Sequence, residues 1–354
     1  MTYPMSIKIA VIGVGRMGKL HCRVLSELPQ AQLVCVVDRD LQAAQAVAAQ
    51  YHCQALESPA QAAAIADAAI VAVPTVGHIQ AALPFVQAGK PVLIEKPIAK
   101  SSAEAQQLLD LAAKTGSTVQ VGHTERFNPA VEALGRYAIT PKFIEATRIS
   151  PFTFRSADVG VVLDMMIHDI DLVLTMAHGD PVSIEAVGVN VIGVHEDIAN
   201  ARLVFANGCV ANLTASRLAI KSERKMRIFS EQAYVSVDYA KKVGAVVRKS
   251  DNRDLIQLAR EKNVKDLAEL ALHMDYSKLV RVEDLQVDET AEPLKKQAES
   301  FCRCVAEGAE PVVSGVAGLA AVRCAERIVQ AIQAHRWDGD RSDRHGLGII
   351  EKDG

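Results

Sequence analysis

A glycine-rich turn between an apolar run and a helix-forming stretch is the feature of this sequence that most restricts its fold. Three glycines in the pattern GxGxxG follow the apolar run Ile7–Ile12 directly. In a strand–turn–helix unit the first glycine allows a tight turn, the second lets a pyrophosphate approach the backbone, and the third lets the helix pack closely on the strand. The free N–H groups of the first helical turn then face the phosphates. The predicted dinucleotide-binding residues of this turn are Gly13, Gly15, Arg16, Met17 and Gly18.

An acidic residue, Asp38, stands twenty positions after the last of these glycines, at the end of the expected strand Gln32–Val37. A carboxylate at this place accepts hydrogen bonds from the ribose hydroxyls of the adenosine and repels a 2′-phosphate, which favours NAD. The next residue, Arg39, would either pair with such a phosphate or stack on the adenine. NADP therefore remains the less favoured alternative.

The region up to about residue 125 alternates β-rich runs with longer stretches of helical periodicity, the pattern of a parallel sheet covered by helices. Strands are expected at Ile7–Ile12, Gln32–Val37, Ala69–Val73, Val92–Ile94 and Thr118–Val121. Helices are expected at Arg16–Leu28, Leu41–Gln50, Ile79–Ala88 and Ser102–Thr115. These elements predict a doubly wound α/β domain.

After about residue 140, strand-like runs follow one another with few helices between them. Strands are expected at Lys142–Ser150, Val182–Val191, Ala199–Phe205, Cys209–Arg217, Lys225–Phe229 and Tyr234–Val237. Helices are expected at Val161–Met176, Glu292–Glu307 and Val316–His335. Runs of strands without crossover helices favour an antiparallel sheet, so the second half is predicted to be α+β.

The length of 354 residues corresponds to about two domains at roughly 150 residues each. We expect a dinucleotide-binding domain at residues 1–125 and a substrate-binding and oligomerisation domain at 126–335. Residues 336–354 include nine charged residues and four glycines. Such a segment buries too little apolar surface to order itself, so we expect a mobile tail.

Composition argues against several classes of partner and location. The 39 basic and 42 acidic residues give a net charge of −3, too near neutral for a nucleic-acid-binding face. The uncharged run Ala68–Gly89 contains prolines and polar side chains, so we expect no membrane span. The seven cysteines and the lack of a secretory signal pattern predict a reduced, cytoplasmic protein. Cys302 and Cys304 have no second Cys or His cluster, so no metal site is expected.

Four further residues are candidates for chemistry. Glu95 and Lys96 follow the strand Val92–Ile94, at the carboxyl edge of a parallel sheet, where ligands bind. Asp164 and His168 are four residues apart in a predicted helix and so share a face. Histidine is the commonest proton acceptor near neutral pH. Taken singly, a lysine between Glu and Pro favours a solvated turn, and a lone histidine favours a satisfied core or surface residue.

Together these motifs resemble the Gfo/Idh/MocA family of NAD(P)-dependent sugar oxidoreductases, over about residues 5–335. The match runs from the GxGxxG through the Glu-Lys-Pro at 95–97 to the Asp-x-x-x-His at 164–168. The resemblance implies a Rossmann domain followed by a domain with a large open sheet, and hydride transfer to a nicotinamide. It implies that Lys96 and His168 are the catalytic pair and that Asp164 positions the substrate hydroxyl or the imidazole. Cofactor contacts are implied for Pro74, Thr75, His78, Glu95 and Lys96.

Residues 121–129 and 162–171 look most like the branch of the family that oxidises the C3 hydroxyl of UDP-N-acetylglucosamine and so supplies amino sugar for lipid A. His123 departs from the apolar or aromatic residue more usual at its place. A UDP-sugar carries a diphosphate, so its pocket needs fixed cations. The candidate substrate-binding side chains are Arg126, Asn128, Arg148, Arg155 and Arg217.

Two other functions and one assembly are consistent with the resemblance. The alternative substrate is another sugar or an inositol. A non-catalytic NAD-binding regulator is the other alternative, and the presence of both Lys96 and His168 argues against it. The family also implies a homodimer or homotetramer built through the open sheet. Apolar residues alternate on both faces of the strands after Val182, and a broad apolar face does not stay in water.

Overall fold

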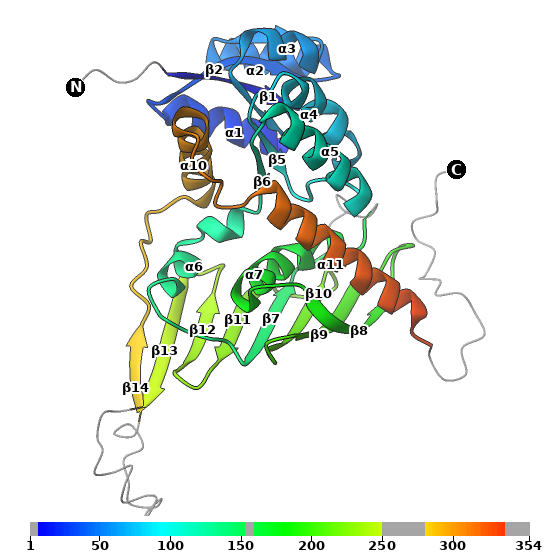
Figure 1. Cartoon of the computed structure of the whole chain (residues 1–354), viewed down its shortest axis with the longest axis vertical. Helices are drawn as coiled ribbons and strands as arrows, with labels where there is room; N and C mark the ends of the chain where they lie inside the picture. The colour runs from blue at the N-terminus through cyan, green and yellow to red at the C-terminus, as the bar shows by residue number, and fades with distance from the viewer. Residues whose placement is uncertain (1–5, 153–158, 250–279, 337–354) are drawn as a thin grey trace, which may run out of the picture.

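The computed structural model describes residues 6–152, 159–249 and 280–336, which form two sheets with helices around and between them (Figure 1). The expected tail, apart from Arg336, lies outside the described residues. Within the described ranges, no helix is long and apolar enough to cross a membrane.

The first sheet is parallel throughout and has the strand order β3-β2-β1-β4-β5-β6. Its strands are β1 (Ile7–Ile12), β2 (Ala31–Val37), β3 (Gln54–Leu56), β4 (Ala68–Val71), β5 (Val92–Glu95) and β6 (Val119–Gly122). Its helices are α1 (Arg16–Glu27), α2 (Leu41–Tyr51), α3 (Pro59–Ile65), α4 (His78–Gln87) and α5 (Ser102–Thr115). This confirms the doubly wound domain and adds β3 and α3, which are short, to the expected elements.

Helices cover both faces of this sheet because its strands are apolar on both faces. In β1, Ala10 and Ile12 join a cluster with residues of α3, α4 and α5. Ile9 and Val11 join the opposite cluster, with residues of α1, α2 and the late helix α10 (Pro293–Glu307). The strand order reverses between β1 and β4, which opens a crevice at their carboxyl ends.

The second sheet has eight strands in the order β14-β13-β12-β11-β7-β10-β9-β8. Its strands are β7 (Phe143–Ile149), β8 (Pro181–Val189), β9 (Ile198–Phe205), β10 (Val210–Ser216), β11 (Glu223–Phe229), β12 (Tyr234–Asp238), β13 (Val243–Lys249) and β14 (Val280–Asp284). All neighbouring pairs are antiparallel except β7 with β10, which confirms a large, mainly antiparallel sheet. Strands β13 and β14 were not among the expected elements.

The helices of the second half lie on one face of this sheet and against the first domain. They are α6 (Pro129–Leu134), α7 (Ile167–Ala177) preceded by the π-helical turn η4 (Val162–Met166), and α11 (Gly315–Ala334). Two short 3-10 turns, η1 (Thr75–Gly77) and η2 (Thr124–Phe127), follow β4 and β6. Helix α11 packs against α7 and β8 of the second domain and against α5 of the first. Helix α11 therefore connects the two domains, whereas α10 packs beside α1 of the first domain (Figure 1).

The other face of the second sheet has one continuous line of apolar side chains, which we call the apolar row. Register places these residues opposite one another on seven neighbouring strands: Val204, Val210, Phe143, Phe229, Tyr234, Val247 and Val282. The rings of Phe143 and Phe229 have centroids 5.6 Å apart, and Phe229 and Tyr234 4.9 Å apart. The adjoining lines are mostly polar, but Val187 and Val189 of β8 and Ile198 of β9 also lie on this face, so the expected apolar alternation holds here for the row and for the end of the sheet at β8.

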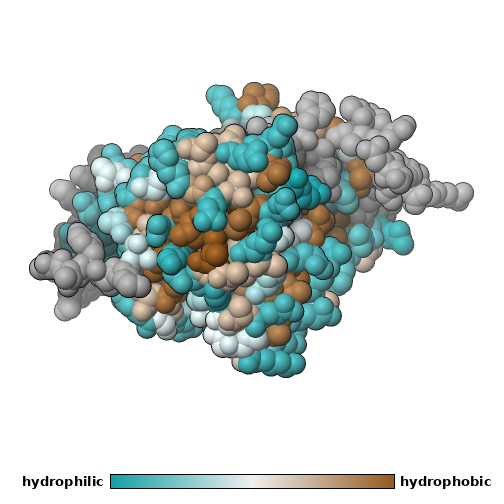
Figure 2. All heavy atoms as spheres, turned by 90° about the horizontal axis from the view of Figure 1, so that it is seen from above, coloured by the Kyte–Doolittle hydropathy of each residue, from teal (hydrophilic) through white to brown (hydrophobic). Residues whose placement is uncertain are grey.

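The end of the molecule where α2 and α3 lie has apolar residues near its middle, surrounded by hydrophilic ones (Figure 2). Leu41 of α2 and Ile65 of α3 are each more than a third exposed. Both helices are alanine-rich, so their outer faces contribute small apolar side chains to the surface.

Candidate active site

The glycine turn between β1 and α1 has the shape that a pyrophosphate needs. A Cβ on Gly13 would lie 2.8 Å from the backbone of Ala72, and one on Gly18 would lie 1.8 Å from the carbonyl oxygen of Gly13. These two glycines are therefore required by the packing of the turn. A Cβ on Gly15 would meet nothing within 4 Å. The space before the first turn of α1 is thus open, and the turn fits a dinucleotide.

The Asp38 carboxylate is held beside this turn at the end of β2. Its two oxygens accept hydrogen bonds from the backbone N–H of Val14 (2.8 Å) and of Asp40 (3.0 Å). Asp38 remains partly exposed, and the neighbouring Arg39 is exposed. The carboxylate is therefore fixed at the place where the adenosine ribose of a bound dinucleotide lies in this fold.

Pro74, Thr75 and His78 follow β4 and line the same cavity as Lys96. The His78 ring is buried, with Nδ1 2.8 Å from the carbonyl oxygen of Pro97 and Nε2 2.9 Å from that of Val73. Burial lowers the pKa of His78 although both carbonyls favour the protonated ring. His78 thus links the loop after β4 to the Glu-Lys-Pro loop after β5, and both of its nitrogens are engaged with the backbone.

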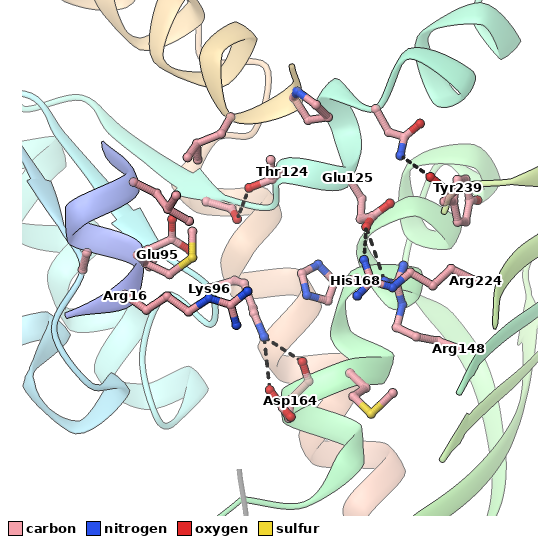
Figure 3. Close-up of a pocket in the computed structure, with 18 of the residues that line it drawn as sticks. Arg16, Glu95, Lys96, Thr124, Glu125, Arg148, Asp164, His168, Arg224 and Tyr239 are labelled. Atoms are coloured by element: carbon pink, nitrogen blue, oxygen red, sulfur yellow. Dashed lines mark hydrogen bonds and ion pairs between the residues drawn. The ribbon is translucent and has the colours of Figure 1, made fainter. Parts of the chain in front are cut away.

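Lys96 connects the two domains across the cavity (Figure 3). Its Nζ donates to the backbone carbonyl oxygen of Asp164 at 2.7 Å and lies 3.4 Å from the Asp164 carboxylate. The Lys96 and Asp164 side chains are 21% and 31% exposed. Both groups are therefore held in place yet accessible from the cavity.

His168 lies in the first turn of α7, just after the π-helical turn that contains Asp164. Its side chain lines the cavity between Lys96 and Arg148 (Figure 3). Burial lowers the pKa of His168 well below its usual value, and the nearby charges of Lys96 and Arg148 lower it further. The ring is therefore neutral at pH 7 and able to accept a proton.

Two arginines, one buried and one exposed, stand on the second-domain side of the cavity. The Arg148 guanidinium makes two hydrogen bonds of 2.9 Å to the Asp169 carboxylate and lies 3.4 Å from Glu125. Burial opposes the charge of Arg148, but Asp169 and Glu125 outweigh burial and raise its pKa. Arg224 lies 3.9 Å from Glu125 and is 52% exposed. Arg148 is thus largely neutralised by carboxylates, whereas Arg224 is the more accessible cation.

The other expected substrate residues are placed differently. Asn128 lines the cavity, but its side chain caps α6 at Ala130 and donates to the carbonyl oxygen of Tyr239. The Arg126 guanidinium is bonded to Asp171 at 2.6 and 2.8 Å, and Arg126 does not line this cavity. Arg217 is paired with Asp197 at 3.1 Å, also away from the cavity lining. Arg155 lies outside the described residues.

The structure adds Glu125, Arg224, Tyr239 and Lys242 to the lining of the cavity. Glu125 belongs to a stretch that the sequence singled out, so it was within reach of motif reasoning. Arg224 depends on the register of β11 against β7, which places it directly opposite Arg148. Tyr239 and Lys242 follow strand β12, and we find no sequence signal that would have identified them.

The cavity, about 810 Å³ in volume, runs from Arg16 and Met17 at the glycine turn to His168 and Arg224 of the second domain. It thus joins a dinucleotide site to a lysine, a neutral histidine and an accessible arginine. Such a two-domain arrangement defines a class of protein, the nicotinamide-dependent oxidoreductases, in which the second domain supplies the substrate side of the site.

Comparisons with known proteins agree with this class. A family model described as "Oxidoreductase family, NAD-binding Rossmann fold" matches residues 7–123, and one for the GFO/IDH/MocA C-terminal domain matches residues 139–236. The UDP-N-acetylglucosamine 3-dehydrogenase of Acidithiobacillus ferrooxidans is 38% identical over 234 residues, covering 66% of this chain and 74% of that protein. The inositol 2-dehydrogenase of Rhizobium meliloti is 27% identical, covering 94% of this chain and 98% of that protein.

A solved structure of the Acidithiobacillus ferrooxidans enzyme has a TM-score of 0.83 and 31% identity, covering 94% of this chain and 99% of that one. The chain therefore belongs to the Gfo/Idh/MocA oxidoreductase family. Its first domain is the family's NAD-binding Rossmann domain, and the protein is an NAD(P)-dependent oxidoreductase that acts on a CH–OH group.

Proposed function

We propose that this protein oxidises the C3 hydroxyl of UDP-N-acetylglucosamine to the 3-keto sugar, with NAD as the hydride acceptor. The observation that carries the proposal is the convergence of Lys96, His168 and a cluster of arginines on one cavity that begins at the dinucleotide turn. The 38% identical relative of that name supports the choice of substrate. We further propose a cytoplasmic location and a role in supplying amino sugar for lipid A.

Oxidation of an alcohol to a ketone requires the hydroxyl proton to leave as the hydride departs from the same carbon. NAD, when bound, supplies the hydride acceptor. His168 is the proposed proton acceptor, because its lowered pKa keeps the ring neutral at pH 7. Lys96, held by Asp164, is proposed to donate a hydrogen bond to the same oxygen as negative charge develops there. The reverse assignment, with Lys96 as the base, would need a deprotonated lysine.

Arg224 is the proposed contact for the diphosphate of the nucleotide sugar. A diphosphate needs a cation whose charge is not already neutralised. Arg148 is 4% exposed and bonded to Asp169, whereas Arg224 is half-exposed and, among the described residues, forms a single ion pair of 3.9 Å with Glu125. We propose that Arg148 positions Glu125 and links β7 to α7 through Asp169, and that Arg224, with Lys242 of the same cavity lining, attracts the anion.

An inositol is the second candidate substrate, because the inositol 2-dehydrogenase of Rhizobium meliloti matches nearly the whole chain. A neutral inositol forms no ion pair with Arg224, so the two candidates differ in what this arginine does. Turnover should be measured as formation of reduced nicotinamide with four compounds: UDP-N-acetylglucosamine, N-acetylglucosamine 1-phosphate, N-acetylglucosamine and myo-inositol. The proposal expects highest kcat/KM for the nucleotide sugar. Equal or faster turnover of myo-inositol would refute it.

A further inference from the structure

Next to the proposed catalytic lysine, a buried pair joins the dinucleotide helix to the end of β5. His21 of α1 is fully buried, and its Nε2 lies 2.7 Å from Oε1 of Glu95. The Glu95 side chain is 10% exposed and lines the cavity. A Cβ on Gly122 would lie 3.0 Å from Oε2 of Glu95, so β6 leaves just enough room for the carboxylate. Neither the hydride transfer nor the proton transfer proposed above uses this pair.

The geometry indicates that the pair has a net negative charge. Nδ1 of His21 is buried and has no hydrogen-bond partner among the described residues. A charged ring would have an N–H at that position, and a buried N–H without an acceptor is costly. A neutral His21 ring with its proton on Nε2 donates the observed hydrogen bond to Glu95 and leaves no N–H at Nδ1. Burial raises the pKa of Glu95, but the hydrogen bond from His21 is the main opposing contribution, and the pKa stays below its usual range.

The fold determines which part of a dinucleotide this charge faces. Asp38 on β2 marks the adenosine side, and the glycine turn after β1 marks the pyrophosphate. The nicotinamide half of the dinucleotide therefore extends past the point between β1 and β4 where the strand order reverses. It points toward the ends of β4 and β5, where Glu95 lies. The oxidised nicotinamide ring is a cation and the reduced ring is neutral. A fixed carboxylate on this side favours the oxidised ring, whereas the opposing charge of Lys96 is engaged by Asp164.

We infer that Glu95, hydrogen-bonded by a neutral His21, stabilises the oxidised over the reduced nicotinamide in this site. The inference rests on the NAD site and not on the identity of the sugar. A protein that binds NAD⁺ more tightly relative to NADH has a lower reduction potential for the bound couple. It thus retains the oxidised cofactor, ready for an alcohol substrate, and releases the reduced form more readily.

The test is equilibrium binding of NAD⁺ and of NADH, each alone and without sugar, to the purified full chain by titration calorimetry. Glu95→Gln keeps the size of the side chain and removes its charge. The ratio of Kd for NADH to Kd for NAD⁺ should fall by about tenfold, which corresponds to about 30 mV for a two-electron couple. His21→Phe should lower the ratio in the same direction, because the carboxylate loses its donor. The double variant should add little to either single change.

Glu292→Gln is the matched control, since Glu292 lines the same cavity but is paired with Arg23 at the surface. Its Kd ratio should equal that of the wild type. A folded Glu95→Gln protein that binds both cofactor forms more weakly by the same factor would show a structural role only and overturn the inference. An equal shift of the ratio in the Glu292 variant would do the same. Because no sugar is present, neither outcome depends on the proposed substrate.

Discussion

Lys96 donates a 2.7 Å hydrogen bond to the backbone carbonyl oxygen of Asp164, which ties the end of β5 to the π-helical turn of the second domain. The contact holds the Lys96 ammonium group at the π-helical turn η4, which directly precedes α7, the helix that carries His168. Two residues that are 72 positions apart in the sequence, Lys96 and His168, thereby line one cavity. The geometry of this contact determines the first prediction.

Replacing Lys96 by Met should lower kcat by about 10²- to 10⁴-fold while the Kd for NAD⁺ stays within a few fold. The substitution removes the donor to the developing alkoxide and the link to Asp164, but leaves the glycine turn and Asp38 intact. Steady-state kinetics and NAD⁺ titration measure the two effects. Lys100→Met, at an exposed lysine paired with Glu104, is the control and should behave as wild type. Near-normal turnover in the Lys96 variant would contradict its role.

The pH dependence of kcat/KM should report His168. Because burial and the charges of Lys96 and Arg148 lower its pKa, the ring is deprotonated at pH 7. Activity should therefore stay level through neutral pH. It should fall only at a pH below about 6.5, the usual pKa of histidine. Removing the Lys96 charge raises the His168 pKa, so the residual activity of Lys96→Met should begin to fall at higher pH. A His168→Ala protein with wild-type turnover and pH profile would exclude His168 as the base.

The parts of the site that were predicted from the sequence are those set by local spacing. The glycine turn, Asp38 and Lys96 each follow a strand end, where a motif and its structure coincide. Arg126 was a sequence candidate that the structure keeps out of the cavity, because Asp171, 45 residues later, binds its guanidinium. Arg224 was missed because its placement depends on strand register. A sequence shows neither long-range pairing nor register, since both follow from how the elements pack.

His123 gives a prediction about stability. Its ring is fully buried beside His168, at a centroid distance of 6.3 Å, and neither nitrogen has a hydrogen-bond partner among the described residues. An unsatisfied buried polar group costs about 1–3 kcal/mol, so His123→Phe should not destabilise the fold and should raise the free energy of unfolding by about 1 kcal/mol at pH 7. A loss of more than this amount would indicate a partner for the ring.

The same variant should change how stability depends on pH. Burial lowers the pKa of His123 in the folded state, so below about pH 6.5 the unfolded chain binds a proton that the folded protein does not. The free energy of unfolding therefore falls as the pH drops from 6.5 toward the folded-state pKa. His123→Phe should reduce this loss, and the remainder comes from His78 and His168, whose pKa values are lowered too. Urea unfolding at pH 5, 6 and 7 measures the difference.

Asp38→Ser should shift cofactor preference from NAD toward NADP. The change removes the carboxylate that would bind the ribose hydroxyls and repel a 2′-phosphate. Hydrogen bonds to a charged group contribute about 1.5–3 kcal/mol, so kcat/KM with NAD should fall by roughly 10- to 100-fold. Asp40→Ser removes a neighbouring carboxylate that caps α2 and should leave the preference unchanged. A wild-type protein that uses NADP better than NAD would contradict this interpretation of Asp38.

The apolar row is the basis of the last prediction, a homodimer or homotetramer built through the open face of the second sheet. Phe229, at the centre of the row, is 36% exposed, and Val282 at its end is 63% exposed. The row crosses seven strands without a polar interruption, and burying it against a second copy would remove a contiguous apolar surface from water. The polar lines beside it, such as Asn200 with Thr214 and Arg202 with Asn212, would form the rim.

Phe229→Arg places a charge at the middle of this row and should convert the assembly into monomers, because burying an unpaired charge costs more than the apolar contact contributes. Sedimentation velocity at micromolar concentration distinguishes the two states directly. Val312→Arg, an exposed apolar position outside the second sheet, is the matched control and should sediment as the wild type does. A wild-type protein that sediments as a stable monomer would refute the proposed assembly. Unchanged assembly in Phe229→Arg would instead locate the interface away from the apolar row.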